Sequence, residues 1–254
     1  MHILVKECEE HISEKECEQL FRLLLKYADV FADKGDKLGR SSAVQHSINT
    51  GDHPPMKQLC RQIPLARQEH AHKLVTEMLA KEVIQPSNSP WASPVVLAQK
   101  KDGTYWFCVD YRKLNFVTRK DAYPLPRIDE TLEALGGSRW FSTLDLLTGY
   151  WQVEVKEEDR PKTAFSTRDG LFEFKVMPFG LCNAPATFQR LMDMVLAGVK
   201  WSSCLVYIDN IVIMGKTFQQ HVDNLGLVLQ KLRGAGLKVK LSKCFLCCKE
   251  VLYT

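Results

Sequence analysis

The segment from Cys204 to Met214 carries a carboxylate, Asp209, inside an otherwise apolar run that is typical of a β-strand. The segment from Trp140 to Tyr150 has the same feature, because Asp145 stands there between two leucines. An isolated carboxylate is costly to bury, since the charge loses its hydration. Two such aspartates in strand-forming sequence must therefore be protonated, paired with basic side chains, or gathered around a divalent cation.

The overall composition is that of a folded globular protein, large enough for one domain or two subdomains. The chain has 254 residues, 45% of them hydrophobic, and its formal net charge is +4. Six basic residues and no acidic one lie between Lys231 and Lys249. Such a stretch is able to follow a phosphate backbone, and a solvated face is the alternative.

The cysteines and the N-terminal residues bear on the cellular compartment. The chain has nine cysteines, and its first residues provide no apolar core of a secretory signal. No apolar run approaches the roughly 18 residues that a membrane span requires. We therefore predict an intracellular protein that has neither a signal peptide nor a transmembrane segment.

Hydrophobic periodicity predicts helices that alternate irregularly with strands. The predicted helices lie near residues 14–31, 67–81, 128–135, 184–195 and 217–232. The predicted strands lie near residues 95–98, 106–109, 152–155 and 171–176, around Asp145, and in a hairpin that contains Asp209. Because the order shows no strict βαβ repeat, the expected fold class is α+β.

Eight motifs follow one another along the chain in a fixed order. They are Ser87–Val96, Phe107–Asn115, Tyr123–Asp129, Phe141–Leu146, Gly149–Val153, Lys162–Phe165, Met177–Leu181 and Asn183–Met192. Together they closely resemble the reverse transcriptases of gypsy-class long-terminal-repeat retrotransposons and their retroviral relatives. A short motif alone arises by chance, whereas the ordered set does not.

The resemblance implies a right-hand polymerase fold whose palm has an antiparallel sheet backed by helices. The polymerase domain is expected at residues 44–254, after an N-terminal helix and spacer at residues 1–43. The expected fingers are residues 55–119 and 153–183, and the expected palm is residues 120–152 and 184–254. The thumb, the connection and the ribonuclease H domain of the family are expected to be absent from this chain.

The resemblance also implies an RNA-directed DNA polymerase that binds an RNA or DNA template–primer and deoxynucleotides. Asp145 and Asp209 match the catalytic aspartates, and the Leu146 carbonyl matches a backbone metal ligand. They would hold two Mg²⁺ ions, with Mn²⁺ as an alternative, for nucleotidyl transfer. A cytoplasmic or retroelement-particle location follows from the family.

Other predicted site residues are carried over with their alternatives. Tyr150 matches the aromatic gate that selects deoxynucleotides, and a core tyrosine is the alternative. Lys100 matches a lysine that contacts the γ-phosphate, unless it is only a solvated hairpin lysine. Phe179 and Gly180 match the loop near the incoming nucleotide. Arg112 resembles a template contact, and an ion pair with Asp110 is the alternative.

Two departures from the family pattern predict impaired turnover. Asn210 stands where the family has a second adjacent aspartate, so the site loses one negative charge near the metal. Trp106 stands where the family has an arginine that braces the triphosphate, so a positive charge is lost there. The expected absence of the thumb would also impair turnover. A catalytically dead nucleic-acid-binding remnant, or a polymerase fold reused by the host, is therefore the alternative function.

Overall fold

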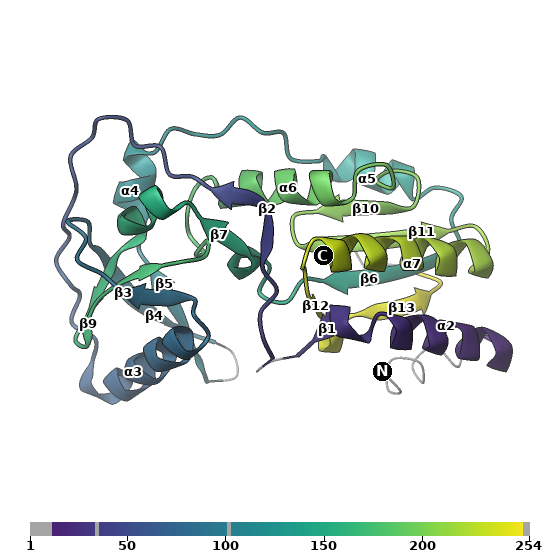
Figure 1. Cartoon of the computed structure of the whole chain (residues 1–254), viewed down its shortest axis with the longest axis horizontal. Helices are drawn as coiled ribbons and strands as arrows, with labels where there is room; N and C mark the ends of the chain where they lie inside the picture. Colours follow the sequence, from purple (N-terminus) through teal and green to yellow (C-terminus); the bar gives the residue numbers. More distant parts are fainter. Residues whose placement is uncertain (1–11, 34–35, 101–102, 251–254) are drawn as a thin grey trace. The chain divides into compact units, whose positions relative to one another are not determined.

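The computed structural model of the chain describes residues 12–33, 36–100 and 103–250 (Figure 1). The fold divides into two compact units, each built from separate stretches of sequence. Unit 1 contains Met1–Ala43, Tyr123–Gln152 and Phe188–Thr254, and unit 2 contains Val44–Ala122 and Val153–Thr187. Helix α6 (Ala184–Val195) begins in unit 2 and ends in unit 1.

Unit 1 is built around a four-stranded antiparallel sheet. The strand order is β10 (Cys204–Tyr207), β11 (Asn210–Gly215), β6 (Trp140–Asp145) and β13 (Phe245–Cys248). The other elements of unit 1 are α2 (Glu14–Lys26), η1 (Ala28–Val30), β1 (Phe31–Ala32), α5 (Ile128–Ala134), η2 (Gly149–Gln152), α7 (Phe218–Gly234), β12 (Val239–Lys240) and η4 (Leu241–Lys243). Strand β1 pairs in parallel with β12.

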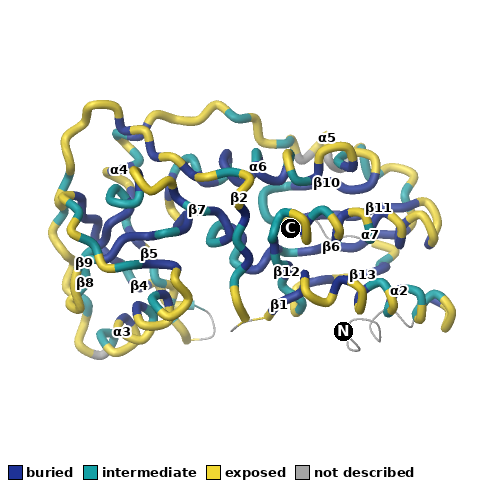
Figure 2. Tube along the Cα trace, in the orientation of Figure 1, coloured by how far each residue is buried: buried dark blue, intermediate teal, exposed yellow. Residues whose placement is uncertain are grey.

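Side chains alternate along the strands of unit 1, and both faces of the sheet are buried. Phe141 of β6 and Val212 of β11 belong to a buried cluster against which Ala134 and Leu135 pack. The next residue of β6, Ser142, points the other way and contacts His221 of α7. Burial on both faces explains why β11 is a nearly continuous apolar run. Figure 2 shows buried residues along both β6 and β11.

Helix α2 and the η1 segment after it pack against α7, and basic residues of the 231–249 stretch contact η1. Gln19 donates to Gln219 at 2.8 Å, Arg233 pairs with Asp29, and Lys238 donates to the Asp29 carbonyl. Three more basic residues of the stretch are also engaged within unit 1: Lys231 with the Ala197 carbonyl, Lys243 with Asp145 and Lys249 over the Trp140 ring. Much of the positive charge in this stretch therefore already has a partner in the fold.

Unit 2 is built around a five-stranded mixed sheet. The strand order is β3 (Ile84–Pro86), β9 (Gly170–Phe174), β8 (Phe165–Thr167), β4 (Ser93–Gln99) and β5 (Tyr105–Val109), and β4 and β8 form its parallel pair. Helices α3 (Leu65–Ala80) and α4 (Arg112–Val117) and the 3₁₀ segment η3 (Glu157–Thr163) complete the unit. Strands β2 (Ser41–His46) and β7 (Val153–Val155) form a separate two-stranded sheet.

The predicted α+β class is confirmed, and each predicted helix and strand has a counterpart. The Asp209 segment forms the expected hairpin, but the placement of Asp209 within a strand is wrong. Ile208 and Asp209 form the two-residue turn between β10 and β11. Turns of this length usually carry Asn-Gly or Asp-Gly, whereas the Ile-Asp pair here has no glycine or asparagine to mark the turn. The turn that joins β4 to β5 follows Lys100. Two of its residues, Lys101 and Asp102, lie outside the described residues.

No helix in the described part of the chain has the length and apolar character that crossing a membrane would demand.

Candidate active site

The two aspartates meet where β6 ends beside the β10–β11 turn in unit 1. Asp145 is the last residue of β6, and its register partner on β11 is Asn210. The next residue, Leu146, donates its backbone N–H to the Asp209 carbonyl at 3.2 Å. Main-chain pairing therefore brings Asp145, Leu146, Asp209 and Asn210 to one end of the sheet.

Close packing encloses the Asp209 side of this site. A Cβ atom on Gly149 would lie 3.1 Å from the Asp209 Cβ and 3.2 Å from the Phe188 ring, so a larger residue would displace one of them. The next residue, Tyr150, packs against Phe188 with ring centroids 5.5 Å apart. Burial, with added repulsion from Asp209 and Tyr207, raises the pKa of Tyr150 to about 12. Tyr150 therefore stays a neutral phenol beside the carboxylates.

The turn that carries Asp209 has an unusual backbone, and a buried glutamine supports it. Ile208 has a φ of 55°, a left-handed conformation that costs about 1–3 kcal/mol for a β-branched residue. Its N–H donates to the Gln189 side chain at 3.1 Å. Gln189 is fully buried and also donates to Asp193, which pairs with Lys200 at 2.5 Å. Sequence reasoning missed Gln189, although a glutamine in an apolar helix stripe was an available indication.

A lysine lies against one of the carboxylates. Lys243 Nζ is 2.8 Å from Asp145 Oδ2. Burial raises the pKa of Asp209 above its usual value, and the negative charge of Asp145 raises it further. A hydrogen bond from its own backbone N–H and the charge of Lys243 oppose this change. The site therefore holds two mutually repelling acids and one ammonium group. The sequence indicated Lys243 only as a member of the basic stretch.

Five of the predicted site residues lie in unit 2, namely Lys100, Trp106, Arg112, Phe179 and Gly180. Lys100 Nζ lies 4.2 Å from the centroid of the Trp106 ring, and Trp106 on edge strand β5 is 57% exposed. The indole and the ammonium group thus form an exposed cation–π pair. Lys100 is only partly buried, and no carboxylate among the described residues pairs with it.

The remaining predicted residues of unit 2 are Arg112, Phe179 and Gly180, and Arg112 already has a partner in the fold. Arg112 grips Asp110 with two hydrogen bonds of 2.8 and 2.7 Å, and Arg61 binds the same carboxylate. The hydrogen bonds and the positive charge of Arg112 lower the pKa of Asp110 to about 2, and the positive charge of Arg61 contributes to this change. Phe179 is half-exposed, and Gly180 follows it with a φ of +93°. The ion-pair alternative for Arg112 is thus present in the structure.

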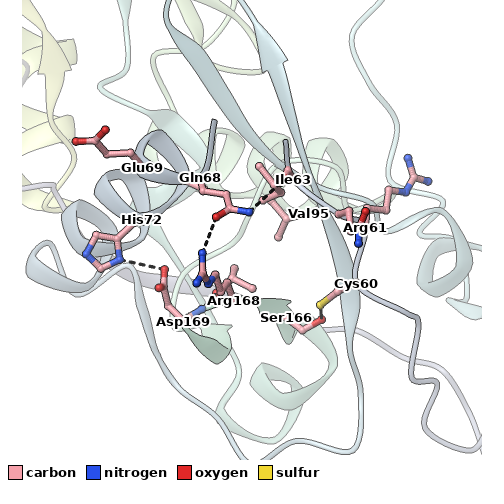
Figure 3. Close-up of a pocket in the computed structure, with 13 residues that line it drawn as sticks. Cys60, Arg61, Ile63, Gln68, Glu69, His72, Val95, Ser166, Arg168 and Asp169 are labelled. Carbon is pink, nitrogen blue, oxygen red and sulfur yellow. Dashed lines mark hydrogen bonds and ion pairs between the residues drawn. The ribbon is translucent and has the colours of Figure 1, made fainter. Parts of the chain in front are cut away.

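A pocket of about 500 Å³ also lies in unit 2, between α3, β4 and the β8–β9 turn (Figure 3). Its polar side chains are largely engaged with one another. Arg168 donates to Gln68 at 2.7 Å, and His72 lies 3.1 Å from Asp169. None of the predicted site residues lines this pocket.

A family model described as reverse transcriptase (RNA-dependent DNA polymerase) matches residues 98–254, more than half of the chain. The chain belongs to this family. The Pol polyproteins of the Drosophila melanogaster transposons 297 and gypsy are 40% identical over 248 residues and 35% identical over 227 residues. The matches cover 95% and 87% of this chain but 23% and 22% of those polyproteins, so the chain spans less than a quarter of their length.

A solved foamy viral protease–reverse transcriptase in complex with an RNA/DNA hybrid has the same fold. It matches with a TM-score of 0.90 at 25% identity, over 99% of this chain and 34% of that one. The predicted resemblance to retrotransposon reverse transcriptases and the predicted fingers-and-palm fold are both confirmed.

Polymerases use divalent metal ions, which require oxygen ligands and negative charge, and unit 1 has side chains of this kind at one end of its sheet. Asp145 and Asp209 offer hard oxygen ligands, and their mutual repulsion is what a divalent cation would relieve. Asn210 adds a neutral amide where a third carboxylate would strengthen binding. Among the described residues, no group of three or more His, Cys, Asp or Glu side chains is placed to hold a metal. The two carboxylates supply the hard oxygen donors that a divalent cation prefers, with less negative charge than three carboxylates would supply.

Proposed function

We propose that this chain is an RNA-directed DNA polymerase domain from a retrotransposon Pol polyprotein. Unit 1 would supply the palm, and unit 2 the fingers, close to the ranges expected from the sequence. The observation that supports this most directly is the meeting of Asp145 and Asp209 at one end of the unit 1 sheet. Family membership alone would not indicate which residues of this chain carry the chemistry.

In this proposal each residue has a defined role. Asp145, Asp209 and the Leu146 carbonyl would hold Mg²⁺, or Mn²⁺ in its place. When bound, the metal activates the primer hydroxyl and neutralises the triphosphate charge. Tyr150 would limit the space at the sugar, because it is packed against Phe188 and cannot move aside freely. Asn210 would complete the site as a neutral neighbour of Asp145.

The residues of unit 2 would contact the incoming nucleotide and the template. Lys100 would contact the triphosphate, with Trp106, Phe179 and Gly180 close to the nucleotide. Arg112 would contact the template strand after exchange of its Asp110 pair. A nucleic-acid partner is supported by the foamy viral relatives, which were solved with double-stranded DNA and with an RNA/DNA hybrid. The location in cytoplasm or retroelement particle stays a prediction.

Primer extension tests this function. The wild-type chain would be given an oligo(dT) primer on poly(rA), with Mg²⁺ and separately with Mn²⁺. We expect weak extension, because Asn210 and Trp106 would impair turnover, and its loss in Asp145→Asn and in Asp209→Asn. Asp129→Asn is the matched control, because Asp129 is an exposed aspartate of α5 in the same unit. Extension that survives both active-site substitutions would contradict the proposed site.

A second candidate is a nucleic-acid-binding protein with little or no turnover, and Asn210 favours it. Asn210 stands directly opposite Asp145 in the sheet register, so its missing charge falls inside the site. This candidate predicts template–primer binding with little or no wild-type extension. The double variant Asn210→Asp with Trp106→Arg is then expected to gain weak synthesis. Robust wild-type extension would eliminate the second candidate.

A further inference from the structure

The turn that carries Asp209 depends on the orientation of one buried amide group. Ile208 has a left-handed backbone, and its N–H donates to Gln189 Oε1 at 3.1 Å. A β-branched residue adopts this conformation only where the surrounding structure holds it there. The hydrogen bond requires the oxygen of the Gln189 side chain to face the turn. The reversed amide would place its NH₂ group against the Ile208 N–H, so that a donor would face a donor.

Asp193, one helical turn further along α6, decides which way this amide points. The Gln189 NH₂ group donates to Asp193 Oδ1 at 2.9 Å. A carboxylate offers only acceptor atoms, so it attracts the NH₂ group and repels the amide oxygen. The two residues are four apart on the helix, a spacing at which side chains on one face meet. Because Asp193 binds the NH₂ group, the oxygen of Gln189 is directed to the Ile208 N–H.

The Asp193 carboxylate is itself held by donors from two other segments of unit 1. Lys200 Nζ lies 2.5 Å from Asp193 Oδ1, and the Tyr123 hydroxyl donates to Asp193 Oδ2 at 2.9 Å. The side chains of Asp193 and Lys200 are mostly buried, with 24% and 16% exposed. The guanidinium group of Arg190 lies 4.6 Å from the centroid of the Tyr123 ring. These contacts fix the carboxylate in place beside Gln189.

We propose that Asp193 is a positioning residue for the metal-binding carboxylate Asp209. It acts through Gln189, whose orientation it sets, and then through Ile208, whose left-handed backbone directs the next residue to the end of β6. The inference rests on the proposed function, because it takes Asp209 as a ligand of the metal. It goes further by assigning a role to a side chain that lies outside the metal site.

Two measurements test the proposal, one on the turn and one on the metal site. Amide hydrogen exchange, followed by NMR on chains with isotopically labelled isoleucine, reports on the Ile208 N–H without any metal. Titration of Mn²⁺ followed by electron paramagnetic resonance reports on the affinity of the site. In Asp193→Leu we expect the Ile208 N–H to exchange about tenfold faster and Mn²⁺ to bind about tenfold more weakly, because the turn loses one hydrogen bond.

Gln189→Leu should give the same two changes. The double variant Asp193→Leu with Gln189→Leu should show no further loss, because both residues act through the same hydrogen bond to the turn. The combined variant Asp193→Leu with Lys200→Met leaves no buried charge unpaired, and it provides the same test if Asp193→Leu alone does not fold. Urea denaturation establishes that each variant is folded under the conditions of the titration.

A rescue at the turn separates positioning from a general loss of stability. Glycine adopts a left-handed backbone without strain, so the turn of Ile208→Gly no longer needs the Gln189 acceptor. In that background Asp193→Leu should weaken Mn²⁺ binding by about twofold or less, against about tenfold in the wild-type background. Lys200→Met keeps the Asp193 carboxylate for the Gln189 NH₂ group. It should lower the stability and leave the Mn²⁺ affinity unchanged.

Asp223 of α7 offers a matched control. It accepts a hydrogen bond of 3.0 Å from Gln219 with the same four-residue spacing, but both residues are exposed, and Gln219 contacts Gln19 of α2. Asp223→Leu should therefore match the wild type in both measurements.

The proposal is overturned if Asp193→Leu leaves either measurement at its wild-type value, or if Ile208→Gly does not reduce the effect of Asp193→Leu on Mn²⁺ affinity. Wild-type Mn²⁺ binding that persists in Asp145→Asn and in Asp209→Asn would overturn the proposed function together with this inference. Binding that requires both of those aspartates but is insensitive to Asp193→Leu overturns the inference alone.

Discussion

Units 1 and 2 each contain a lysine–aspartate pair, and the two pairs differ in their surroundings. In unit 2, Lys162 lies 2.6 Å from the buried Asp159, and both side chains also hydrogen-bond the backbone of Ile48. In unit 1, Lys243 lies 2.8 Å from Asp145, with 54% of the lysine side chain exposed against 22% for Lys162. The first pair fixes the course of the chain at Ile48. The second pair stands in the candidate site, and neither of its side chains hydrogen-bonds a backbone group of the described residues.

The strongest way to break this comparison is to remove the aspartate of each pair. Asp159→Ala would leave the mostly buried Lys162 ammonium group without its carboxylate. It would also remove the acceptor of the Ile48 N–H and disturb the bond from Lys162 to the Ile48 carbonyl. We expect the free energy of unfolding to fall by about 3 kcal/mol. Asp145→Ala removes a partly exposed pair and also the repulsion on Asp209, so its effect should stay below about 1 kcal/mol. Urea denaturation of both variants at pH 7 measures the difference.

Equal losses in the two variants would show that the Lys243 pair is structural like the other. Lys162→Met is a useful further control, because it leaves Asp159 with the Ile48 N–H and an aliphatic neighbour of similar length. A smaller loss than in Asp159→Ala is expected.

Acid should destabilise both units alike, because the described part of each contains one buried histidine. His46 of unit 2 contacts Thr187 at 2.8 Å, and His221 of unit 1 contacts Ser142 at 2.7 Å. Burial lowers the pKa of each to about 4, against an opposing influence of Asp159 and Asp121 on His46. The unfolded chain therefore binds more protons between pH 6.5 and pH 4, and stability falls as the pH drops through that window. We expect a loss of about 2 kcal/mol per histidine between pH 7 and pH 5.

Urea denaturation at pH 7 and pH 5 checks this prediction. His46→Gln and His221→Gln should each remove about half of the pH-dependent loss, and a wild-type stability that is constant over this range would contradict it. Comparing the two variants at pH 7 also measures what each imidazole contributes in its neutral form.

Sequence patterns located the parts of the site that depend on residue type and missed those that depend on the folded backbone. Asp145 and Asp209 were evident because a charge in an apolar run is conspicuous. The left-handed turn at Ile208 was not, since neither residue of the turn is a glycine or asparagine. Gln189 and Lys243 act through contacts that are distant in sequence, with Ile208 and with Asp145. No local period encodes such partners.

The Lys243 pair also predicts how the site responds to metal. The ammonium group halves the negative charge of the two carboxylates, so a divalent cation must displace it from Asp145. We expect Lys243→Met to raise the affinity for Mn²⁺ about tenfold, equivalent to about 1.4 kcal/mol. Titration of Mn²⁺ followed by electron paramagnetic resonance measures this without any turnover.

Lys240→Met is the control for the metal experiment, because Lys240 lies three residues away on β12 and makes no ion pair with Asp145 in the described fold. Its affinity should equal that of the wild type. Asp145→Asn should abolish the binding that Lys243→Met strengthens. Unchanged affinity in Lys243→Met, with binding still sensitive to Asp145, would show that the ammonium group does not compete with the metal.

The smallest expected effect concerns α7, the helix that supports the unit 1 sheet. Thr217 is its N-cap, and the Thr217 side chain accepts a hydrogen bond from the Gln220 N–H at 3.2 Å. Thr217→Ala should lower the free energy of unfolding by about 1 kcal/mol, because one N–H at the helix start loses its acceptor. Thr217→Ser should restore most of the loss, since serine offers the same oxygen. Helix α7 packs on β6, which ends at Asp145, and on β11, which begins at Asn210. A loss of several kcal/mol in Thr217→Ala would therefore mean that the cap also positions these two strands. The Mn²⁺ affinity would then fall together with the stability.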